Sequence, residues 1–261
     1  MGCRTAIVIV NWNTRTLLLA CLESVRRFAS EAEVWVVDNA SHDGSAEAVR
    51  TQFPEVRLIA NAENAGFARA NNQAIRKSTA PYVWLLNPDT ELREGALEAL
   101  EAVLDADPHT AVVGSGLLNP DGSPQPCSFA FPTPFSSFAE WLLLPRPLAR
   151  TRDRLLGLTP RRDAGPTDWV LGASLLVRRT AIDAVGLLDE GYFMYSEELD
   201  WCHRFRQAGH DVRLAPDSVV VHHGGASTRQ MPERMLIELF KSRARSFGLR
   251  RSPRAEARFT R

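Results

Sequence analysis

Short apolar segments alternate with helical patterns over the first 115 residues of the chain. Four continuous runs of mostly apolar residues have the length of buried strands: 5–10, 34–37, 56–59 and 82–86. Three segments between them carry apolar side chains at the spacing of one helix face: 17–25, 45–53 and 67–77. Strands that alternate with helices build βαβ units. The sequence therefore predicts an α/β fold, with a mostly parallel central sheet that helices cover on both faces.

The pattern is less regular beyond residue 115. A helix at 95–104 and a strand at 111–113 complete the first half, and seven of the 16 prolines lie between Pro120 and Pro147. Five later segments resume the alternation: helix 135–144, sheet 169–177, helix 197–207, strand 219–222 and an amphipathic helix at 231–247. We expect one domain over 1–230, with halves 1–115 and 116–230, followed by a basic helical tail over 231–261.

Cysteine spacing and the length of the apolar runs bear on the compartment. The four cysteines are far apart and form no CxxC pair: Cys3, Cys21, Cys127 and Cys202. This spacing disfavours a zinc cluster or a disulfide framework and favours a reducing cytoplasm. No apolar run approaches the roughly 18 residues of a membrane span, and we expect no signal peptide before the first apolar run.

The end of the chain is basic although the formal net charge is zero. Residues 232–261 contain nine basic and three acidic side chains. Such a tail fits a nucleic acid, an anionic lipid or a solvated helix face. Because apolar side chains at 135–144 precede the arginine-rich segment 146–162, we predict peripheral contact with the inner face of a membrane and no nucleic-acid partner. An ordinary acceptor lid with a solvated tail is the alternative.

Polar clusters follow four of the predicted strands. They are Asn11-Trp12-Asn13, Asp38-Asn39-Ala40-Ser41, the segment 61–64 and Asn87-Pro88-Asp89. Turn chemistry alone explains one such cluster, because Asn, Asp and Ser favour turns. In an open parallel sheet, however, ligands bind beyond the carboxyl ends of the strands. Four clusters at matching ends predict one polar ligand that lies across the sheet.

The sequence lacks the usual phosphate-binding loops, since neither G-x-G-x-x-G nor the P-loop pattern follows the first strand. A diphosphate would then need a divalent cation held by carboxylates. Asp89 and His222 stand at strand ends where they could bind one, although a turn cap and a structural histidine are the ordinary alternatives. Helical spacing puts Glu197 and Asp200 on one face and Glu198 on another.

Together these segments resemble the family 2 glycosyltransferases with the GT-A fold, especially the rhamnosyltransferase-like branch. The likeness runs from about Thr5 to Ser227. Its first-half pieces are Val8-Ile9-Val10-Asn11-Trp12-Asn13, Val36-Val37-Asp38-Asn39-Ala40-Ser41, Asn64-Ala65-Gly66-Phe67 with Asn71-Asn72, and Leu86-Asn87-Pro88-Asp89. The later pieces are Asp121-Gly122-Ser123, Trp169-Val170-Leu171-Gly172-Ala173, Phe193-Met194-Tyr195, Glu197-Glu198-Leu199-Asp200 and His222-His223-Gly224-Gly225.

The resemblance implies a role for individual residues. Asp38 corresponds to the carboxylate that accepts N3–H of uracil or thymine, and Asn11, Asn64 and Asn87 complete the nucleotide pocket of the half 1–115. Asp89 is the implied ligand of Mg²⁺ or Mn²⁺, together with His222, and His223 is the alternative histidine. Glu198 stands where the family usually has a catalytic aspartate. The half 116–230 supplies the acceptor side, to which we assign Trp169, Gly172, Ala173, Glu197 and Asp200.

The implied activity is an inverting, metal-dependent sugar transfer from a nucleoside-diphosphate sugar to an acceptor hydroxyl. The branch points to dTDP-rhamnose, with UDP-sugars second, and to cell-wall, capsule or O-antigen-type glycans that are free or lipid-linked. A QxxRW motif of processive synthases is absent, which favours single additions. Two alternatives stay open: a silent domain that only binds nucleotide-sugars, and a nucleotidyltransferase, which needs a glycine-rich basic loop that Asn11-Trp12-Asn13-Thr14 does not provide. The sequence leaves the linkage formed and the oligomeric state undetermined.

Overall fold

The computed structural model describes residues 3–133, 163–225 and 230–251. Its helices are α1 (Arg15–Phe28), α2 (Ser45–Gln52), α3 (Phe67–Lys77), α4 (Ala96–Ala106), α7 (Arg179–Val185), α8 (Glu197–Gln207) and α9 (Pro232–Arg251). Its strands are β1 (Thr5–Asn11), β2 (Glu33–Asp38), β3 (Arg57–Ala60), β4 (Tyr82–Leu86), β5 (Thr90–Leu92), β6 (Thr110–Leu118), β7 (Pro124–Gln125), β8 (Ser128–Phe129), β9 (Gly165–Thr167), β10 (Trp169–Val170), β11 (Ser174–Arg178) and β12 (Asp211–His222).

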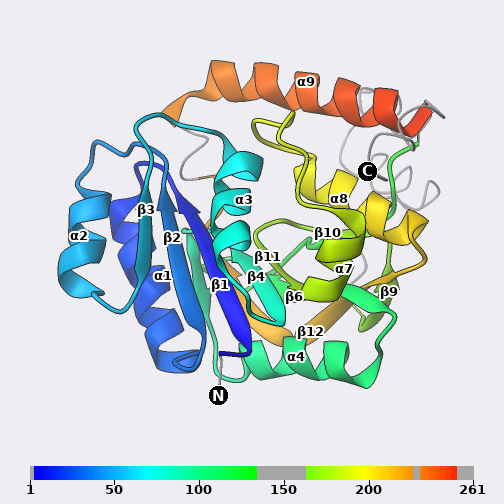
Figure 1. Ribbon diagram of the computed structural model, residues 1–261, viewed down its shortest axis with the longest axis horizontal. Helices are drawn as coiled ribbons and strands as arrows, with labels where there is room; N and C mark the ends of the chain where they lie inside the picture. Colours follow the sequence, from blue (N-terminus) through cyan, green and yellow to red (C-terminus); the bar gives the residue numbers. More distant parts are fainter. Residues whose placement is uncertain (1–2, 134–162, 226–229, 252–261) are drawn as a thin grey trace.

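One central sheet organises the molecule (Figure 1). Its strand order is β3-β2-β1-β4-β11-β6-β12-β5, with β7 paired to β6 and β9 to β12. The first four strands of this order are parallel, and β6 is parallel to β12. Strand β11 lies antiparallel between β4 and β6. Six of the ten strands thus run in one direction, namely β1, β2, β3, β4, β6 and β12. This confirms the predicted mostly parallel sheet.

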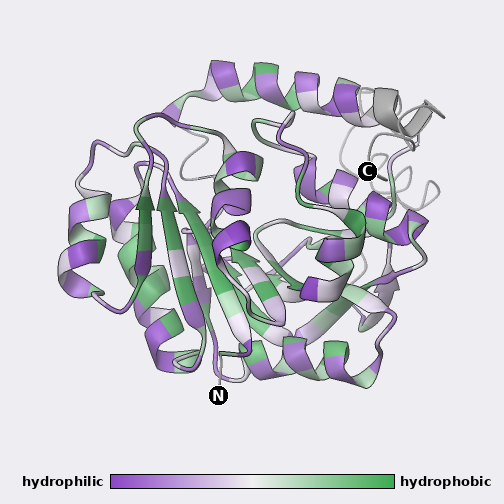
Figure 2. Cartoon of the chain, viewed as in Figure 1, coloured by the Kyte–Doolittle hydropathy of each residue, from purple (hydrophilic) through white to green (hydrophobic). Residues whose placement is uncertain are grey.

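Helices cover both faces of this sheet, as predicted. The side chains of β1 alternate between two cores because successive residues of a strand point to opposite faces. Ile7 and Ile9 pack in a core with residues of α1, α2 and α4, whereas Ala6 and Val8 pack with residues of α3, α7 and α8. Figure 2 shows the resulting pattern, with hydrophobic central strands and helices whose faces alternate in polarity.

The second half differs from the sequence prediction in two places. The segment 169–177 was expected to continue the sheet, but it is divided: β10 pairs with β8 in a separate two-stranded sheet, and β11 enters the central sheet. The three residues between them, Leu171, Gly172 and Ala173, line a pocket instead. The last strand is longer than predicted, because β12 begins at Asp211 and contains an irregularity between Ala215 and Val219. The expected division at residue 115 falls inside β6.

Helix α9 packs on the loop that precedes α8. The Ser242 hydroxyl donates to the Met194 carbonyl at 2.7 Å, and the Arg245 guanidinium pairs with Asp189 at 2.7 Å. The other side of the helix is apolar and exposed: Leu236 and Ile237 are each 54% exposed. The predicted segments 135–144 and 146–162, and the tail beyond residue 251, lie outside the described residues. Among the helices that the structure describes, none is long and apolar enough to cross a membrane.

Candidate active site

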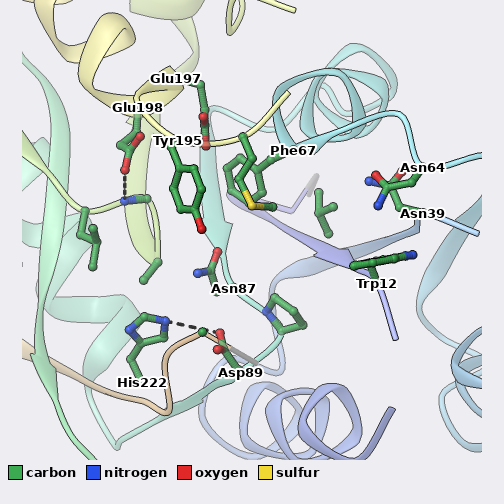
Figure 3. A pocket seen from close by; sticks show the side chains of 17 residues that line it. Trp12, Asn39, Asn64, Phe67, Asn87, Asp89, Tyr195, Glu197, Glu198 and His222 are labelled. Carbon is green, nitrogen blue, oxygen red and sulfur yellow. Dashed lines mark hydrogen bonds and ion pairs between the residues drawn. The ribbon is translucent and has the colours of Figure 1, made fainter. Parts of the chain in front are cut away.

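A pocket of about 250 Å³ opens at the carboxyl ends of β1 and β4, beside the start of α8 (Figure 3). Its walls come from both halves of the chain. The lining residues are Val10, Trp12, Asn39, Asn64, Phe67, Asn87, Pro88, Asp89, Leu171, Gly172, Ala173, Met194, Tyr195, Glu197, Glu198, His222 and Gly225. The close-up shows three groups of side chains around the pocket: Glu197 with Glu198, Asp89 with His222, and Trp12 with Asn39 and Asn64.

Two buried glutamates begin α8 at the wall of this pocket. Glu197 is 5% exposed and Glu198 9% exposed. One Glu198 oxygen accepts the backbone N–H of Gly172 at 3.3 Å, and the Oε2 atoms of both residues are buried without a hydrogen-bond partner. Burial raises the pKa of each carboxyl above its usual value, and the charge of Glu198 raises that of Glu197 further. The pair provides a proton acceptor poised at the pocket wall.

The acidic residues at the start of α8 divide between the pocket and the protein interior. Helical spacing placed Glu197 with Asp200 and apart from Glu198, yet Glu197 and Glu198 both line the pocket. Asp200 is turned into the protein, where it pairs with the buried guanidinium of Arg204 at 2.9 Å. At the start of this helix the preceding loop, rather than helical spacing alone, decides which side chains reach the pocket.

Asp89 and His222 face each other at another part of the wall. Asp89 follows β4 and His222 ends β12, and the Asp89 Oδ1 to His222 Nε2 distance is 3.4 Å. The other imidazole nitrogen, Nδ1, lies 2.7 Å from the Gln125 amide oxygen. His223 instead contacts Glu91 at 3.0 Å and does not line the pocket. The geometry therefore favours His222 as the histidine of this site.

A divalent cation fits the Asp89 and His222 pair. Nε2 of His222 is buried and has no hydrogen-bond partner, and it faces a carboxylate oxygen across a short gap. Over the described residues, no three His, Cys, Asp or Glu side chains form a closed metal cluster. Mg²⁺ and Mn²⁺ sites of phosphate-handling enzymes do not need one, because one or two protein ligands are completed by phosphate oxygens and water. The donor set is thus suited to a cation shared with a bound diphosphate.

Left-handed backbone marks the loops around the pocket. Four non-glycine residues have positive φ in the described part of the chain: Asn13 (52°), Ala40 (61°), Tyr195 (70°) and Ser196 (67°). Such conformations cost of order 1–3 kcal/mol each and collect at functional sites. The last two stand directly before α8 and aim the Tyr195 ring into the pocket, where Figure 3 shows it between the glutamates and Asn87.

Gly66 ties this loop to the first half of the chain. It has a φ of 82°, and a Cβ atom there would lie 2.6 Å from the Phe193 carbonyl oxygen. The same carbonyl accepts the backbone N–H of Phe67 at 2.7 Å. Glycine is therefore required at this position, because only it allows the close approach that seats residues 193–195 beside α3.

The nucleotide residues expected from sequence fall into two groups. Asn64, Asn87 and Asp89 line the pocket. Asp38 and Asn11 are not among the lining residues but adjoin Asn39 and Val10, which are: Asn11 Nδ2 donates to Asp38 Oδ1 at 2.9 Å, and the backbone N–H of Ser41 donates to Asp38 Oδ2 at 3.0 Å. Asn11 is fully buried, and its amide holds the Asp38 carboxylate in place.

The acceptor residues expected from sequence are also divided. Gly172, Ala173 and Glu197 line the pocket, whereas Trp169 and Asp200 do not. Trp169 stacks on Phe129 with ring centroids 4.6 Å apart. Sequence reasoning assigned no role to Trp12, Asn39, Met194 or Tyr195, which do line it. The sequence signal that could have identified these four residues is their position within the polar clusters or just before the acidic start of α8.

Comparison with known proteins gives this pocket a context. A family model described as "Glycosyl transferase family 2" matches residues 6–126. An N-acetylglucosaminyl-diphospho-decaprenol L-rhamnosyltransferase of Mycobacterium tuberculosis (strain CDC 1551 / Oshkosh) is 32% identical over 223 residues, which cover 80% of this chain and 72% of the relative.

Two solved structures are similar in fold. The crystal structure of GalNAc-T7 with UDP, GalNAc and Mn²⁺ has a TM-score of 0.62 at 16% identity, over 84% of this chain and 43% of the other. The mannosyltransferase PcManGT from Pyrobaculum calidifontis, in complex with GDP-Man and Mn²⁺, has a TM-score of 0.61 at 19% identity, over 93% of this chain and 64% of the other. The chain thus spans less than two thirds of either protein, and at these identities the likeness concerns the fold.

Proposed function

Since the chain belongs to glycosyl transferase family 2, we propose that it transfers a sugar with inversion and with the help of a divalent cation, from a nucleoside diphosphate to an acceptor hydroxyl. Membership makes the chain a glycosyltransferase, and its fold is GT-A. The observation that supports an inverting, metal-dependent mechanism is the composition of one pocket. It combines a buried carboxylate base, Glu198, with two side chains that could bind a cation, Asp89 and His222. Inverting transfer needs both a base and a means to neutralise a leaving diphosphate.

The chain's own residues divide the chemistry between them. Glu198 takes the proton of the acceptor hydroxyl while that oxygen bonds to the anomeric carbon. The bond from this carbon to the diphosphate oxygen breaks on the opposite face, so the single displacement inverts the centre. Gly172 holds the Glu198 carboxylate in position through its backbone N–H. A cation held by Asp89 and His222 would supply Lewis-acid stabilisation to the departing diphosphate.

We propose dTDP-rhamnose as the donor, with a UDP-sugar as the alternative, and a lipid-linked glycan as the acceptor. The similarity to the N-acetylglucosaminyl-diphospho-decaprenol L-rhamnosyltransferase of Mycobacterium tuberculosis supports this choice. A transfer assay that pairs dTDP-rhamnose or UDP-sugars with a polyprenyl-diphosphate-linked sugar tests it. Equal transfer from GDP- or ADP-sugars would refute the donor assignment.

The pocket should prefer UDP and dTDP over GDP and ADP. The Asp38 carboxylate is only 3% exposed and is held by two donors, Asn11 and Ser41, so it is fixed as a hydrogen-bond acceptor. That acceptor matches N3–H of uracil or thymine. With Mn²⁺ present, we expect the two pyrimidine nucleotides to raise the melting temperature more than the purine ones, and Asp38→Asn to remove this difference.

The control for this preference is Glu63→Gln, which removes an exposed carboxylate next to the pocket residue Asn64. It should keep the wild-type nucleotide preference. Equal protection by all four nucleotides in the wild-type protein would contradict the assignment of Asp38.

Helix α9 supports a proposed contact with an anionic membrane surface. In the described part of the chain, the large exposed apolar side chains are Met231, Leu236, Ile237 and Phe240. An apolar helix face flanked by basic residues is typical of interfacial binding. We expect the protein to sediment with anionic vesicles at low salt, and the double variant Leu236→Ser with Ile237→Ser to stay in solution. Wild-type protein that does not bind such vesicles would refute the contact.

A further inference from the structure

A chain of hydrogen bonds runs from the protein surface to His222. Ser123 Oγ donates to Asp121 Oδ1 at 2.6 Å, and Asn119 Nδ2 donates to Ser123 Oγ at 2.9 Å. Gln125 Nε2 donates to Asn119 Oδ1 at 3.1 Å, and Gln125 Oε1 lies 2.7 Å from His222 Nδ1. Asp121 and Ser123 are exposed, whereas His222 is buried at the pocket wall.

The Asp121 carboxylate at the outer end determines which group donates and which accepts in each of these hydrogen bonds. An ionised carboxylate only accepts, so the single hydroxyl proton of Ser123 points to Asp121 and its oxygen can accept from Asn119. The Asn119 amide must then turn its NH₂ group to Ser123 and its oxygen to Gln125. Gln125 in turn has its NH₂ group on Asn119 and its oxygen on His222. Reversing either amide would set two acceptors or two donors against each other.

The direction of the chain fixes the tautomer of His222. The amide oxygen of Gln125 only accepts, so the proton of the neutral imidazole is on Nδ1 and the lone pair is on Nε2. That Nε2 atom is buried, has no hydrogen-bond partner, and lies 3.4 Å from Asp89 Oδ1. Two acceptor atoms that face each other in this way leave room for a cation as their shared partner.

The sheet holds Gln125 where this contact is possible. Leu117 of β6 pairs on one side with Gln125 of β7 and on the other with Val220 of β12. The strand that carries Gln125 and the strand that ends at His222 therefore flank the same segment of β6. A turn precedes β7, in which the Asn119 N–H donates to the Ser123 carbonyl at 2.8 Å and the Gly122 N–H donates to the Asn119 carbonyl at 2.9 Å.

We propose that Gln125 is a positioning residue, which with Asn119, Ser123 and Asp121 keeps His222 in its Nδ1–H tautomer and presents Nε2 to a divalent cation at Asp89. This inference rests on the proposed metal-dependent function. Partners behind a ligating histidine orient the ring and fix its tautomer, and their loss typically lowers metal affinity by about 10–100-fold. Gln125 itself does not line the pocket, so it acts through His222.

The experiment has two readouts besides activity. Nitrogen-15 NMR of the metal-free protein at about pH 8, where imidazoles are largely neutral, reports which ring nitrogen of His222 carries the proton. Electron paramagnetic resonance of free Mn²⁺, titrated in the presence of UDP or dTDP, reports metal affinity. We expect the wild-type protein to show the Nδ1–H tautomer. Gln125→Leu removes the acceptor and should shift His222 towards the Nε2–H tautomer, with Mn²⁺ affinity lower by about 10–100-fold.

Two further variants sharpen the test. Gln125→Glu still accepts from Nδ1–H, so it should keep the tautomer and hold Mn²⁺ affinity much closer to the wild-type value than Gln125→Leu does. His223→Gln removes the neighbouring imidazole, which contacts Glu91 outside the pocket, and should leave both readouts of His222 unchanged. The inference is overturned if Gln125→Leu keeps the tautomer and the affinity while wild-type protein binds Mn²⁺. A wild-type protein that binds no Mn²⁺ would instead overturn the proposed metal-dependent function, and with it the role of the hydrogen bonds from Asp121 to His222.

Discussion

Replacing Glu198 with glutamine should reduce the rate of sugar transfer by roughly 10²–10⁴-fold, the usual share of general acid–base catalysis. Glutamine keeps the shape and can still accept the backbone N–H of Gly172, but it cannot take a proton. Donor binding should stay close to wild type, because Glu198 lies at the end of the pocket away from Trp12, Asn39 and Asn64. Single-turnover transfer rates and nucleotide titrations separate the two effects.

Protein stability provides the control for this variant. Burial raises the pKa of Glu198 in the folded state above its usual value. The stability contributed by the bound proton is therefore present below the unfolded-state pKa and is lost as pH rises through the folded-state pKa. At about pH 8, Glu198→Gln should melt no lower than wild type, since it removes a buried charge. A loss of transfer under these conditions reports catalysis rather than unfolding.

The pH dependence should have the same origin. Transfer by the wild-type protein should rise with pH as Glu198 loses its proton, over a range above the usual pKa of an exposed glutamate. Glu198→Asp shortens the reach by one methylene and should retain partial activity with a similar acid limb. Transfer by Glu198→Gln at the wild-type rate, with Glu197→Gln inactive, would show that the base is the neighbouring carboxylate.

Replacing Asp89 with alanine or asparagine should abolish the metal dependence of donor binding and nearly all transfer. A bound divalent cation contributes several kcal/mol to a phosphate-leaving step, which corresponds to about 10²–10³-fold in rate or more. Neither lysine of the chain lines the pocket, so no ammonium there can replace the cation. Calorimetric titration of UDP or dTDP, with Mn²⁺ and with a chelator, measures the effect.

The matched control for Asp89 is Glu91→Gln. It removes a carboxylate two positions along the chain that contacts His223 and does not line the pocket. This variant should keep Mn²⁺-dependent nucleotide binding. Full turnover of the wild-type protein in excess chelator would exclude the metal claim and the role of His222 with it.

The first half of the fold was predictable because its patterns are local. Strands β1, β2 and β4 are short and largely buried apolar runs, β3 is a short edge strand, and helices α1 to α3 fall close to the predicted segments. The second half was harder because its geometry depends on distant contacts. Nothing local in 169–177 indicates that Leu171, Gly172 and Ala173 leave the sheet, since their position follows from β10 pairing with β8 and from the contact of Gly172 with Glu198.

The residue types of the site were more predictable than the directions in which its side chains point. The family resemblance assigned Asp89, Glu198 and His222 to one site, and all three line the pocket at the carboxyl-end edge of the sheet. The roles of Asn11 and Tyr195 depended on backbone and hydrogen-bond details. Asn11 turns towards Asp38, and the positive φ of Tyr195 directs its ring into the pocket.

The strand order of the sheet has a consequence for biosynthesis. Strand β4 pairs with β1 on one side and with β11 on the other, yet β6 is made before β11 and lies beyond it. The outer edge of β4 therefore cannot be covered until Ser174–Arg178 has left the ribosome. At about 5–20 residues per second, the nascent chain carries an open, apolar strand edge for several seconds. Pairing of the antiparallel strand β11 with β4 and β6 is thus a late step of chain growth, and until then the growing chain can expose the β4 edge to chaperones or to its neighbours.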